Sequence, residues 1–229
     1  MKTIGLIGGM SWESSLEYYR YMNEAVKQRL GGLHSARILM NSVDFAPIRE
    51  LMVSGDWKTV GDRLADAART LEQAGAELMV IGTNTMHKVA PRIEEAVSVP
   101  VVHIADATAE VARAGGFSRL ALLGTAFTME EDFYLGRLRE HGFKVLVPDA
   151  DDRKLVDRVI FDEMCKGLFL DDSRAEFVRI IEGLAAQGAE AVVLGCTEIG
   201  MLVRPGDTDV PTLDTCRIHA ERVVDIALG

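Results

Sequence analysis

Residues 77–82 read ELMVIG, and residues 189–195 read AEAVVLG. Both runs are mostly apolar, are too short for an amphipathic helix, and end in glycine. Such runs are typical of strands that are buried on both faces of a parallel sheet. Small polar residues follow each run, with TNT at 83–85 and CTE at 196–198. Since ligands bind beyond the carboxyl ends of parallel strands, these two turns are the first candidates for a functional site.

Similar apolar runs alternate with longer amphipathic stretches along the rest of the chain. We expect further strands at residues 3–8, 37–43, 99–103, 119–124 and 144–147. We expect helices at residues 11–30, 47–53, 57–74, 87–97, 105–114, 127–141, 151–166, 173–187 and 216–228. Ser11 is a suitable N-cap for the first helix, and Glu13 is favourable in its first turn. Strands that alternate with helices of this length predict parallel sheets covered on both faces.

The two halves of the chain carry the same landmarks in the same order. They are Gly8 and Gly124, Gly82 and Gly195, and the Val-Pro pairs at 99–100 and 210–211. The nearly constant spacing favours one α/β unit used twice; the alternative is that buried strands of this class simply end alike. Because Gly115-Gly116 interrupts the pattern, we expect an N-terminal α/β domain at residues 1–115 and a C-terminal α/β domain at residues 116–229. The last helix of the N-terminal domain is able to cross over and pack on the second domain.

The expected fold class is therefore α/β, with two pseudo-symmetric parallel-sheet domains and the active site in the cleft between them. Composition agrees with a globular protein, since 48% of the 229 residues are hydrophobic and 26% are charged. The formal net charge of -10, with no basic run, argues against a nucleic-acid or membrane partner. No segment has the 18 or so consecutive apolar residues that a transmembrane helix needs.

Three cysteines, at positions 165, 196 and 216, form neither a Cys-x-x-Cys motif nor a metal-ligand pattern. Reduced thiols are the simplest interpretation, and together with an opening apolar run too short for a signal peptide they predict a cytoplasmic protein. Cys165 and Cys216 lie within expected helices, so we expect them to be structural. Cys196 follows a glycine at a strand end and precedes a helix, whose N-terminus is expected to lower the thiol pKa. The alternative for Cys196 is a small buried apolar residue.

Other polar residues gather at the expected strand ends. They are Ser11 after Gly9-Met10, Thr83, Asn84 and Thr85 after Gly82, Thr125 after Gly124, and Thr197 and Glu198 after Cys196. If the two halves pack with pseudo-twofold symmetry, Thr83 and Cys196 occupy equivalent positions on opposite sides of one cleft. The backbone N–H groups of such turns are suited to a carboxylate. Arg49 is either a surface charge or the clamp for a substrate carboxylate.

Two nucleotide motifs and a metal site are disfavoured. The run GLIGGM has Ile7 where the dinucleotide fingerprint needs glycine, and the P-loop Gly-Lys-Ser/Thr is absent. A tight strand-to-helix turn is the better interpretation. His87, His103, His141 and His219 have no ligand spacing, so no metal is expected.

The turns GTNTMH at 82–87 and GCTEIG at 195–200, with IGLIGGMSWE at 4–13, resemble the aspartate/glutamate racemase family. DF at 44–45, HIADAT at 103–108 and LLGT at 122–125 extend the resemblance over nearly the whole chain. The resemblance is greatest to the bacterial amino-acid racemase branch, which uses no pyridoxal cofactor. It implies two α/β domains, a homodimer, an amino acid as small-molecule substrate, and no cofactor. It also implies two cysteines that stand on opposite faces of the substrate α-carbon.

By this resemblance Cys196 is the second catalytic cysteine, and Thr83 takes the place of the first. A hydroxyl is a poor base but is able to deliver or relay a proton, so the resemblance implies a directional bias that favours the L-enantiomer. Asn84, Thr85 and Thr197 match positions that bind the α-carboxylate and amino group. Met10 and Thr125 are expected to line the pocket. Glutamate racemases typically carry histidine where this chain has Glu198, which favours the aspartate or a broader branch.

The expected function is a cofactor-independent racemase acting on aspartate and/or glutamate by proton abstraction and return on opposite faces of the α-carbon. Three alternatives stay open. A single-cysteine decarboxylase of the same superfamily fits the lone Cys196. A non-catalytic amino-acid-binding protein fits the loss of one acid/base group. A generic two-domain binding protein with a structural Cys196 is the third.

Overall fold

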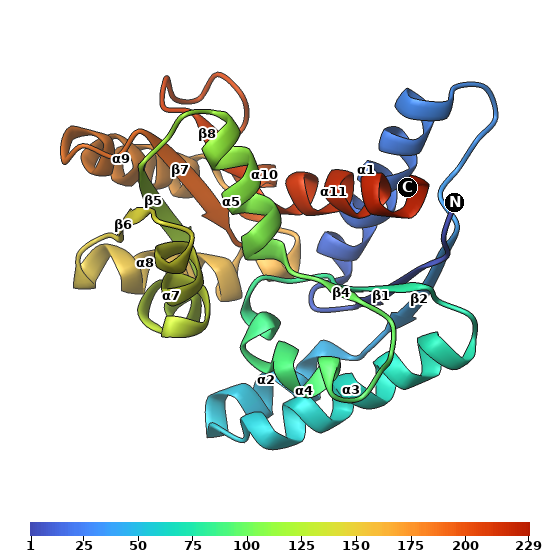
Figure 1. Ribbon diagram of the computed structural model, residues 1–229. Coiled ribbons are helices and arrows are strands. Elements are labelled where there is room, and N and C mark those ends of the chain that lie inside the picture. The colour runs from blue at the N-terminus through green and yellow to red at the C-terminus, as the bar shows by residue number, and fades with distance from the viewer. The chain divides into compact units, whose positions relative to one another are not determined.

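Two four-stranded parallel sheets organise the chain (Figure 1). The computed structural model describes residues 1–229, which divide into two compact units. Unit 1 contains Met1–His103 and His219–Gly229, and unit 2 contains Ile104–Ile218. None of the helices is both long enough and apolar enough to cross a membrane.

Unit 1 has its sheet in the order β2-β1-β3-β4. The strands are β1 (Ile4–Gly8), β2 (Ile38–Ser42), β3 (Leu78–Ile81) and β4 (Val101–Val102). The helices are α1 (Trp12–Leu30), α2 (Phe45–Ser54), α3 (Trp57–Gln73), the 3₁₀ helix η1 (Thr85–Val89), α4 (Ala90–Glu94) and most of α11 (Thr215–Leu228). Within this unit α2, α3 and α4 lie on one side of the sheet, and α1 and α11 lie on the other (Figure 1).

Unit 2 has its sheet in the order β6-β5-β7-β8. The strands are β5 (Arg119–Gly124), β6 (Lys144–Leu146), β7 (Ala191–Gly195) and β8 (Thr212–Asp214). The helices are α5 (Ile104–Ala114), α6 (Ala126–Glu130), α7 (Asp132–Glu140), α8 (Ala150–Asp162), the 3₁₀ helix η2 (Met164–Lys166), α9 (Asp171–Ala186) and α10 (Ile199–Leu202).

The two sheets have the same topology, which confirms the expected fold class. In each unit the first strand pairs with the second and the third, and the fourth strand pairs with the third. β3 in unit 1 therefore corresponds to β7 in unit 2. Thr83 and Cys196 follow these corresponding strands at the carboxyl edges of their own sheets.

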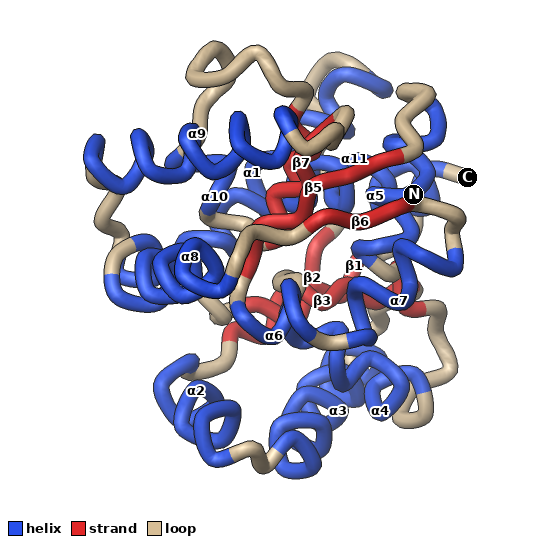
Figure 2. Tube along the Cα trace, turned by 90° about the vertical axis from the view of Figure 1, so that its left-hand side faces the viewer, coloured by secondary structure: helices blue, strands red, loops and turns tan.

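The two central strands of unit 2, β5 and β7, are buried on both faces, as their continuous apolar sequence predicts. Ala121 and Leu123 pack with residues of α8 and α9, whereas Leu120 and Leu122 pack with residues of α5 and α7. Figure 2 shows α8 and α9 on one side of β5 and β7, with α5 and α7 on the other. This alternation follows from the two-residue period of a strand.

The two units divide the chain at different residues from the boundary expected at 115/116. α5 packs on unit 2, because Ile104, Ala109 and Ala112 share a core cluster with Leu120. The last residues pack on unit 1 instead. The N–H of Lys2 donates to the carbonyl of Ala227, and Arg29 pairs with Asp225 at 2.5 Å. The chain thus leaves unit 1 after His103 and returns to it at His219.

Three expected helices are interrupted. The helix expected at 127–141 is two helices, because Glu131 is extended with φ −104° and ψ 152°. The helix expected at 151–166 ends as α8, and Glu163 leads into η2. The helix expected at 87–97 is η1 followed by the short α4, which carries a proline in its first turn. Ser11 caps α1 as expected, since its side chain accepts the N–H of Ser14.

Candidate active site

The turn after β3 holds three of the expected site residues close to the sheet. The N–H of Gly82 donates to the carbonyl of Ile7 at 2.9 Å, and that of Thr83 donates to the carbonyl of Ile81 at 2.8 Å. A Cβ atom at Gly82 would lie 3.0 Å from the same Ile7 oxygen, so glycine is needed for this close approach. Thr83, Asn84 and Thr85 are all buried. The turn is therefore a fixed element that presents small polar groups at the carboxyl edge of the sheet.

Cys196, at the end of β7, lies in a cluster with a hydroxyl, a carboxylate and a second thiol. Its Sγ donates to Glu198 Oε2 at 2.9 Å, and Thr197 Oγ1 donates to the same oxygen at 2.7 Å. Cys165 Sγ, on η2, lies 3.8 Å from Glu198 Oε1. Glu198 is 2% exposed. A buried carboxylate that accepts hydrogen bonds from a thiol and a hydroxyl is satisfied, and it is also positioned to take the proton of the thiol.

The electrostatic environment of Cys196 differs from the one expected from the sequence. Burial, followed by the negative charge of Glu198, raises the pKa of the Cys196 thiol well above its usual value. The expected lowering by a helix N-terminus is therefore wrong. The helix that follows, α10, begins only at Ile199 and has four residues, whereas the carboxylate is in direct contact with the sulfur. The resting sulfur is a thiol, and a thiolate forms only when its proton is accepted elsewhere.

Sequence reasoning missed two members of this cluster. The sequence places Glu198 at a strand end but assigns it no part in the chemistry, and it predicts a structural role for Cys165. The signal for Glu198 was a carboxylate two residues after a cysteine in a tight turn, a spacing that lets both side chains meet. No comparable signal existed for Cys165, because the break between α8 and η2 brings it to Glu198.

The remaining expected residues lie within their own units. Met10 follows β1 and is buried, at the same sheet edge as the Thr83 turn. Thr125 follows β5 and is buried as the N-cap of α6, where its Oγ1 accepts the N–H of Thr128 at 3.3 Å. Arg49 lies on α2 and is half-buried. Unit 1 therefore brings Met10 together with residues 83–85, and unit 2 brings Thr125 together with residues 196–198.

Glu13 is a further buried carboxylate at the start of α1. It is 7% exposed, and its Oε2 has no hydrogen-bond partner. An unpaired buried carboxylate oxygen is costly in a native structure. It is also an acceptor for a cationic group such as an ammonium.

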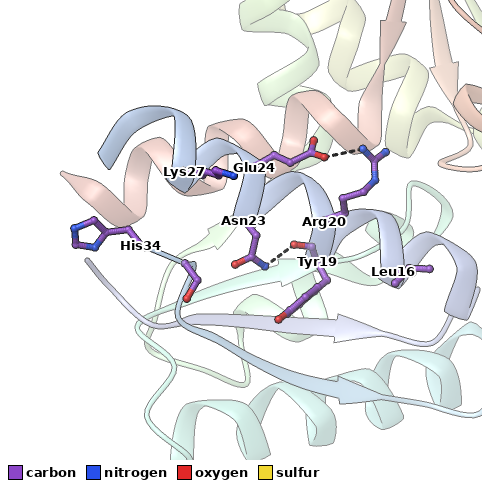
Figure 3. Close-up of a pocket in the computed structure, with 8 residues that line it drawn as sticks. Leu16, Tyr19, Arg20, Asn23, Glu24, Lys27 and His34 are labelled. Atoms are coloured by element: carbon purple, nitrogen blue, oxygen red, sulfur yellow. Dashed lines mark hydrogen bonds and ion pairs between the residues drawn. The ribbon is translucent and has the colours of Figure 1, made fainter. Parts of the chain in front are cut away.

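Unit 1 also has an open hollow of about 450 Å³ (Figure 3). It runs along α1, and the residues that line it are Leu16, Tyr19, Arg20, Asn23, Glu24, Lys27, His34 and Ser35. Its polar groups bond locally, since Asn23 donates to the carbonyl of Tyr19 and Arg20 pairs with Glu24 (Figure 3). None of the expected site residues lines it. No group of three or more His, Cys, Asp or Glu side chains is arranged to hold a metal ion.

Comparisons with known proteins place the chain among racemases. The model of the Asp/Glu/hydantoin racemase family matches residues 7–223. The chain is similar to a Yersinia pestis protein assigned to the Asp/Glu racemases, with 50% identity, 100% coverage of both chains and a TM-score of 0.92. It is also similar to an aspartate racemase homologue from Pyrococcus horikoshii OT3, with 34% identity, 100% coverage of both chains and a TM-score of 0.85.

A curated relative extends the range of named substrates. The broad-specificity amino-acid racemase RacX of Bacillus subtilis is 24% identical over 167 residues, which is 72% of this chain and 71% of RacX. The relatives whose activity is named are thus isomerases that act on amino acids. Because the family model matches almost the full length, the chain belongs to the Asp/Glu/hydantoin racemase family and is an isomerase.

Proposed function

We propose that this isomerase is a cofactor-independent racemase that acts on aspartate and/or glutamate, with a preference for the L-enantiomer. Cys196 takes the α-proton on one face of the α-carbon, and Thr83 returns a proton on the other. The observation that carries this proposal is the buried contact of 2.9 Å between Cys196 Sγ and Glu198 Oε2. It gives a thiol with a raised pKa a neighbouring group that accepts its proton.

The proton transfers follow from this pair. Glu198 accepts the Sγ proton, and the resulting thiolate removes the α-proton of the L-substrate. Loss of that proton places negative charge on the α-carbon and the carboxylate oxygens. Backbone N–H groups and hydroxyls of the two turns stabilise this charge, as no electron sink is involved. Thr83 delivers or relays a proton to the opposite face, which produces the D-enantiomer.

Substrate binding is assigned to the small polar residues of the turns. Asn84, Thr85 and Thr197 bind the α-carboxylate and the amino group, and the free oxygen of Glu13 is the acceptor in unit 1 best suited to an ammonium. Met10 and Thr125 line the pocket. This division uses groups that are already buried at the two sheet edges, so little ordering is needed when substrate binds.

Arg49 is proposed to bind the distal carboxylate of the substrate. Arg49→Ala is expected to raise KM for aspartate and glutamate about tenfold or more, because a charge-assisted bidentate contact is lost. Initial rates on both substrates measure this. Arg63→Ala, at an exposed position of α3, is the matched control and is expected to leave KM unchanged. Unchanged kinetics in Arg49→Ala would remove this role.

The proposed assembly follows the family resemblance, and the proposed location follows the expectation of reduced cysteines. We propose a cytoplasmic homodimer that binds an amino acid as its small-molecule substrate. The net charge of -10 supports a protein without nucleic-acid or anionic-membrane partners. Light scattering of the purified protein measures the assembly, and a mass equal to one chain would reject the dimer.

Incubation with single L- and D-amino acids in D₂O tests the proposed reaction. NMR follows loss of the α-proton, and chiral chromatography follows inversion. L-aspartate or L-glutamate is expected to exchange and invert. Cys196→Ala is expected to abolish both, whereas Cys216→Ala, at a buried position outside the Glu198 cluster, serves as the matched control.

The same experiment separates the other functions. Release of CO₂ from a dicarboxylic substrate without exchange of amino acids would favour the single-cysteine decarboxylase, which the lone Cys196 also fits. Binding without exchange or CO₂ would favour an amino-acid-binding protein. Full activity of Cys196→Ala would leave the cysteine without a catalytic role.

A further inference from the structure

Three buried histidines meet behind the Thr83 turn in unit 1. The ring centroids of His87 and His103 are 4.4 Å apart, and those of His87 and His219 are 5.9 Å apart. All three side chains are buried, and His219 is completely so. His87 lies on η1, His103 directly follows β4, and His219 lies on α11, far from the other two in the sequence. The proposed reaction uses none of them.

Hydrogen bonds fix the tautomer of His219. Its Nε2 lies 2.8 Å from the carbonyl oxygen of Val102, so Nε2 carries the proton and donates. Its Nδ1 lies 2.8 Å from the hydroxyl of Tyr18, so in the neutral ring Nδ1 accepts from that hydroxyl. Burial lowers the pKa of His219 to about 4, which agrees with a neutral ring. His219 is therefore an uncharged ring that two hydrogen bonds hold in one orientation within the cluster.

His87 forms the link from this cluster to the Thr83 turn. In an α-helical turn the N–H of residue 87 would donate to the carbonyl of residue 83. In this 3₁₀ segment it donates to the carbonyl of Asn84 instead, at 3.1 Å. The ring of His87 contacts the carbonyl of Thr83 with Nδ1 at 2.8 Å, so Nδ1 carries the proton and donates. A side chain thus takes over a bond that regular helix geometry would have supplied.

We propose that His87 is a positioning residue that holds Thr83 through its backbone carbonyl, with His103 and His219 fixing the His87 ring from behind. The inference rests on the proposed function, in which Thr83 serves the second face of the α-carbon. An imidazole suits this place because its N–H reaches the carbonyl while its ring packs against two other rings. Without the ring, the carbonyl loses this donor and the turn at 82–85 loses a buried tie.

In the proposed reaction a different residue serves each face of the α-carbon. Displacement of Thr83 therefore has an effect that differs from loss of folded protein. Exchange of the α-proton of an L-substrate needs only Cys196, since the thiol can return a solvent deuteron to the same face. Inversion also needs Thr83 in place. A displaced Thr83 therefore lowers inversion more than it lowers exchange, whereas general loss of folded protein lowers both equally.

The test measures this ratio in two variants. His87→Leu is expected to raise the ratio of α-proton exchange to inversion about tenfold or more, because small displacements at a reacting centre have large effects on rate. His87→Asn keeps an N–H close to the Nδ1 position and is expected to restore the ratio to within about threefold of the parent protein. His34→Leu, at an exposed position of the same unit, is the matched control.

Amide hydrogen exchange provides a second readout that needs no turnover. The peptide covering residues 82–90 is expected to exchange faster in His87→Leu than in His87→Asn or in His34→Leu, with other peptides of unit 1 unchanged. If the parent protein exchanges no amino acid at all, the proposed function fails, and this measurement still decides whether His87 holds the turn. Unchanged protection in His87→Leu, or changed protection with an unchanged exchange-to-inversion ratio, overturns the positioning role.

Discussion

Glu198 acts on Cys196 in two opposite ways at the scale of single residues. Its negative charge and its hydrogen bond disfavour a resting thiolate, and this contributes to the raised pKa of the thiol. The same carboxylate is the nearest acceptor for the proton when substrate arrives. A thiol with a raised pKa reacts slowly with electrophiles, and it is deprotonated only beside a bound substrate.

Glu198→Gln separates these two effects. Removal of the charge is expected to lower the pKa of Cys196, so iodoacetamide should alkylate Cys196 several times faster near neutral pH. Racemisation should fall by about 100-fold, because the proton acceptor is lost. Mass spectrometry of the peptide that carries Cys196 measures alkylation, with Cys216 in the same digest as internal reference. A parallel rise or a parallel fall of the two rates would contradict this division of roles.

Thr83→Cys tests the asymmetry between the two faces. The equilibrium constant of racemisation is unity, so kcat/KM for inversion is equal in the two directions, and the expected bias of the parent protein appears in α-proton exchange and in rates at saturating substrate. A thiol at position 83 can ionise, whereas a hydroxyl cannot do so readily. The variant is therefore expected to raise the initial rate of α-proton exchange of the D-enantiomer about tenfold or more. Deuterium wash-in from each enantiomer is the measurement, and equal rates for both enantiomers in the parent protein would remove Thr83 from the missing-base position.

At the scale of elements, close contact between β5 and β7 sets the position of the Cys196 turn. A Cβ atom at Gly195 would lie 2.7 Å from Leu122 Cδ1 and 2.8 Å from the carbonyl oxygen of Leu123. A Cβ atom at Gly124 would lie 2.8 Å from the carbonyl oxygen of Gly195. The backbones at these strand ends can approach only because both residues are glycine.

Alanine at two glycines should have opposite effects on stability. Gly195→Ala is expected to lower the free energy of unfolding by about 1–3 kcal/mol, since backbone and side chains must move to admit the methyl group. Gly183→Ala, within α9 and with no atom within 4 Å of the added Cβ, is expected to raise it by up to about 1 kcal/mol. Urea denaturation of both variants measures this. A stabilised Gly195→Ala protein would mean that the strand ends are less tightly packed.

Sequence pattern predicted the elements that depend on local signals. Continuous apolar runs located β1, β3, β5 and β7, and Ser11 located the start of α1. The sequence did not predict the breaks at Glu131 and Glu163, because glutamate is also common inside helices. The position of each break depends on tertiary packing. The roles of the residues in the two turns stay predictions, and the approach of Cys165 to Glu198 was not predicted. Pairing across such breaks depends on tertiary structure that no local pattern encodes.

At the scale of the whole molecule, stability depends on keeping a buried imidazole neutral. His219 is fully buried, with Tyr18, His87 and the Val102 carbonyl around it, and its pKa is lowered to about 4 from the usual 6.5. The unfolded chain therefore binds a proton that the folded chain does not bind between these pH values. The free energy of unfolding contributed by this group falls as the pH falls from about 6.5 to about 4, by about 3 kcal/mol in total, and is constant above that range.

His219→Gln is expected to reduce this acid dependence. The difference in unfolding free energy between about pH 7 and about pH 4.5 should be smaller in the variant by about 2 kcal/mol, although the variant is itself less stable near neutral pH. Urea denaturation at the two pH values is the measurement. His34→Gln, on an exposed loop, should show the parent's acid dependence. An unchanged difference in His219→Gln would place the acid sensitivity in other groups.

The route of the chain through the two units sets the order in which they are completed during synthesis. Ile104–Ile218 leave the ribosome as one continuous stretch, so unit 2 has all of its residues before unit 1 does. Unit 1 begins first but must wait for His219–Gly229, which supply the partner of Tyr18 and the donor to the Val102 carbonyl. In that interval the groups of unit 1 that bond to α11 in the folded structure lack these partners. The unit whose synthesis begins first is therefore the unit that is completed last.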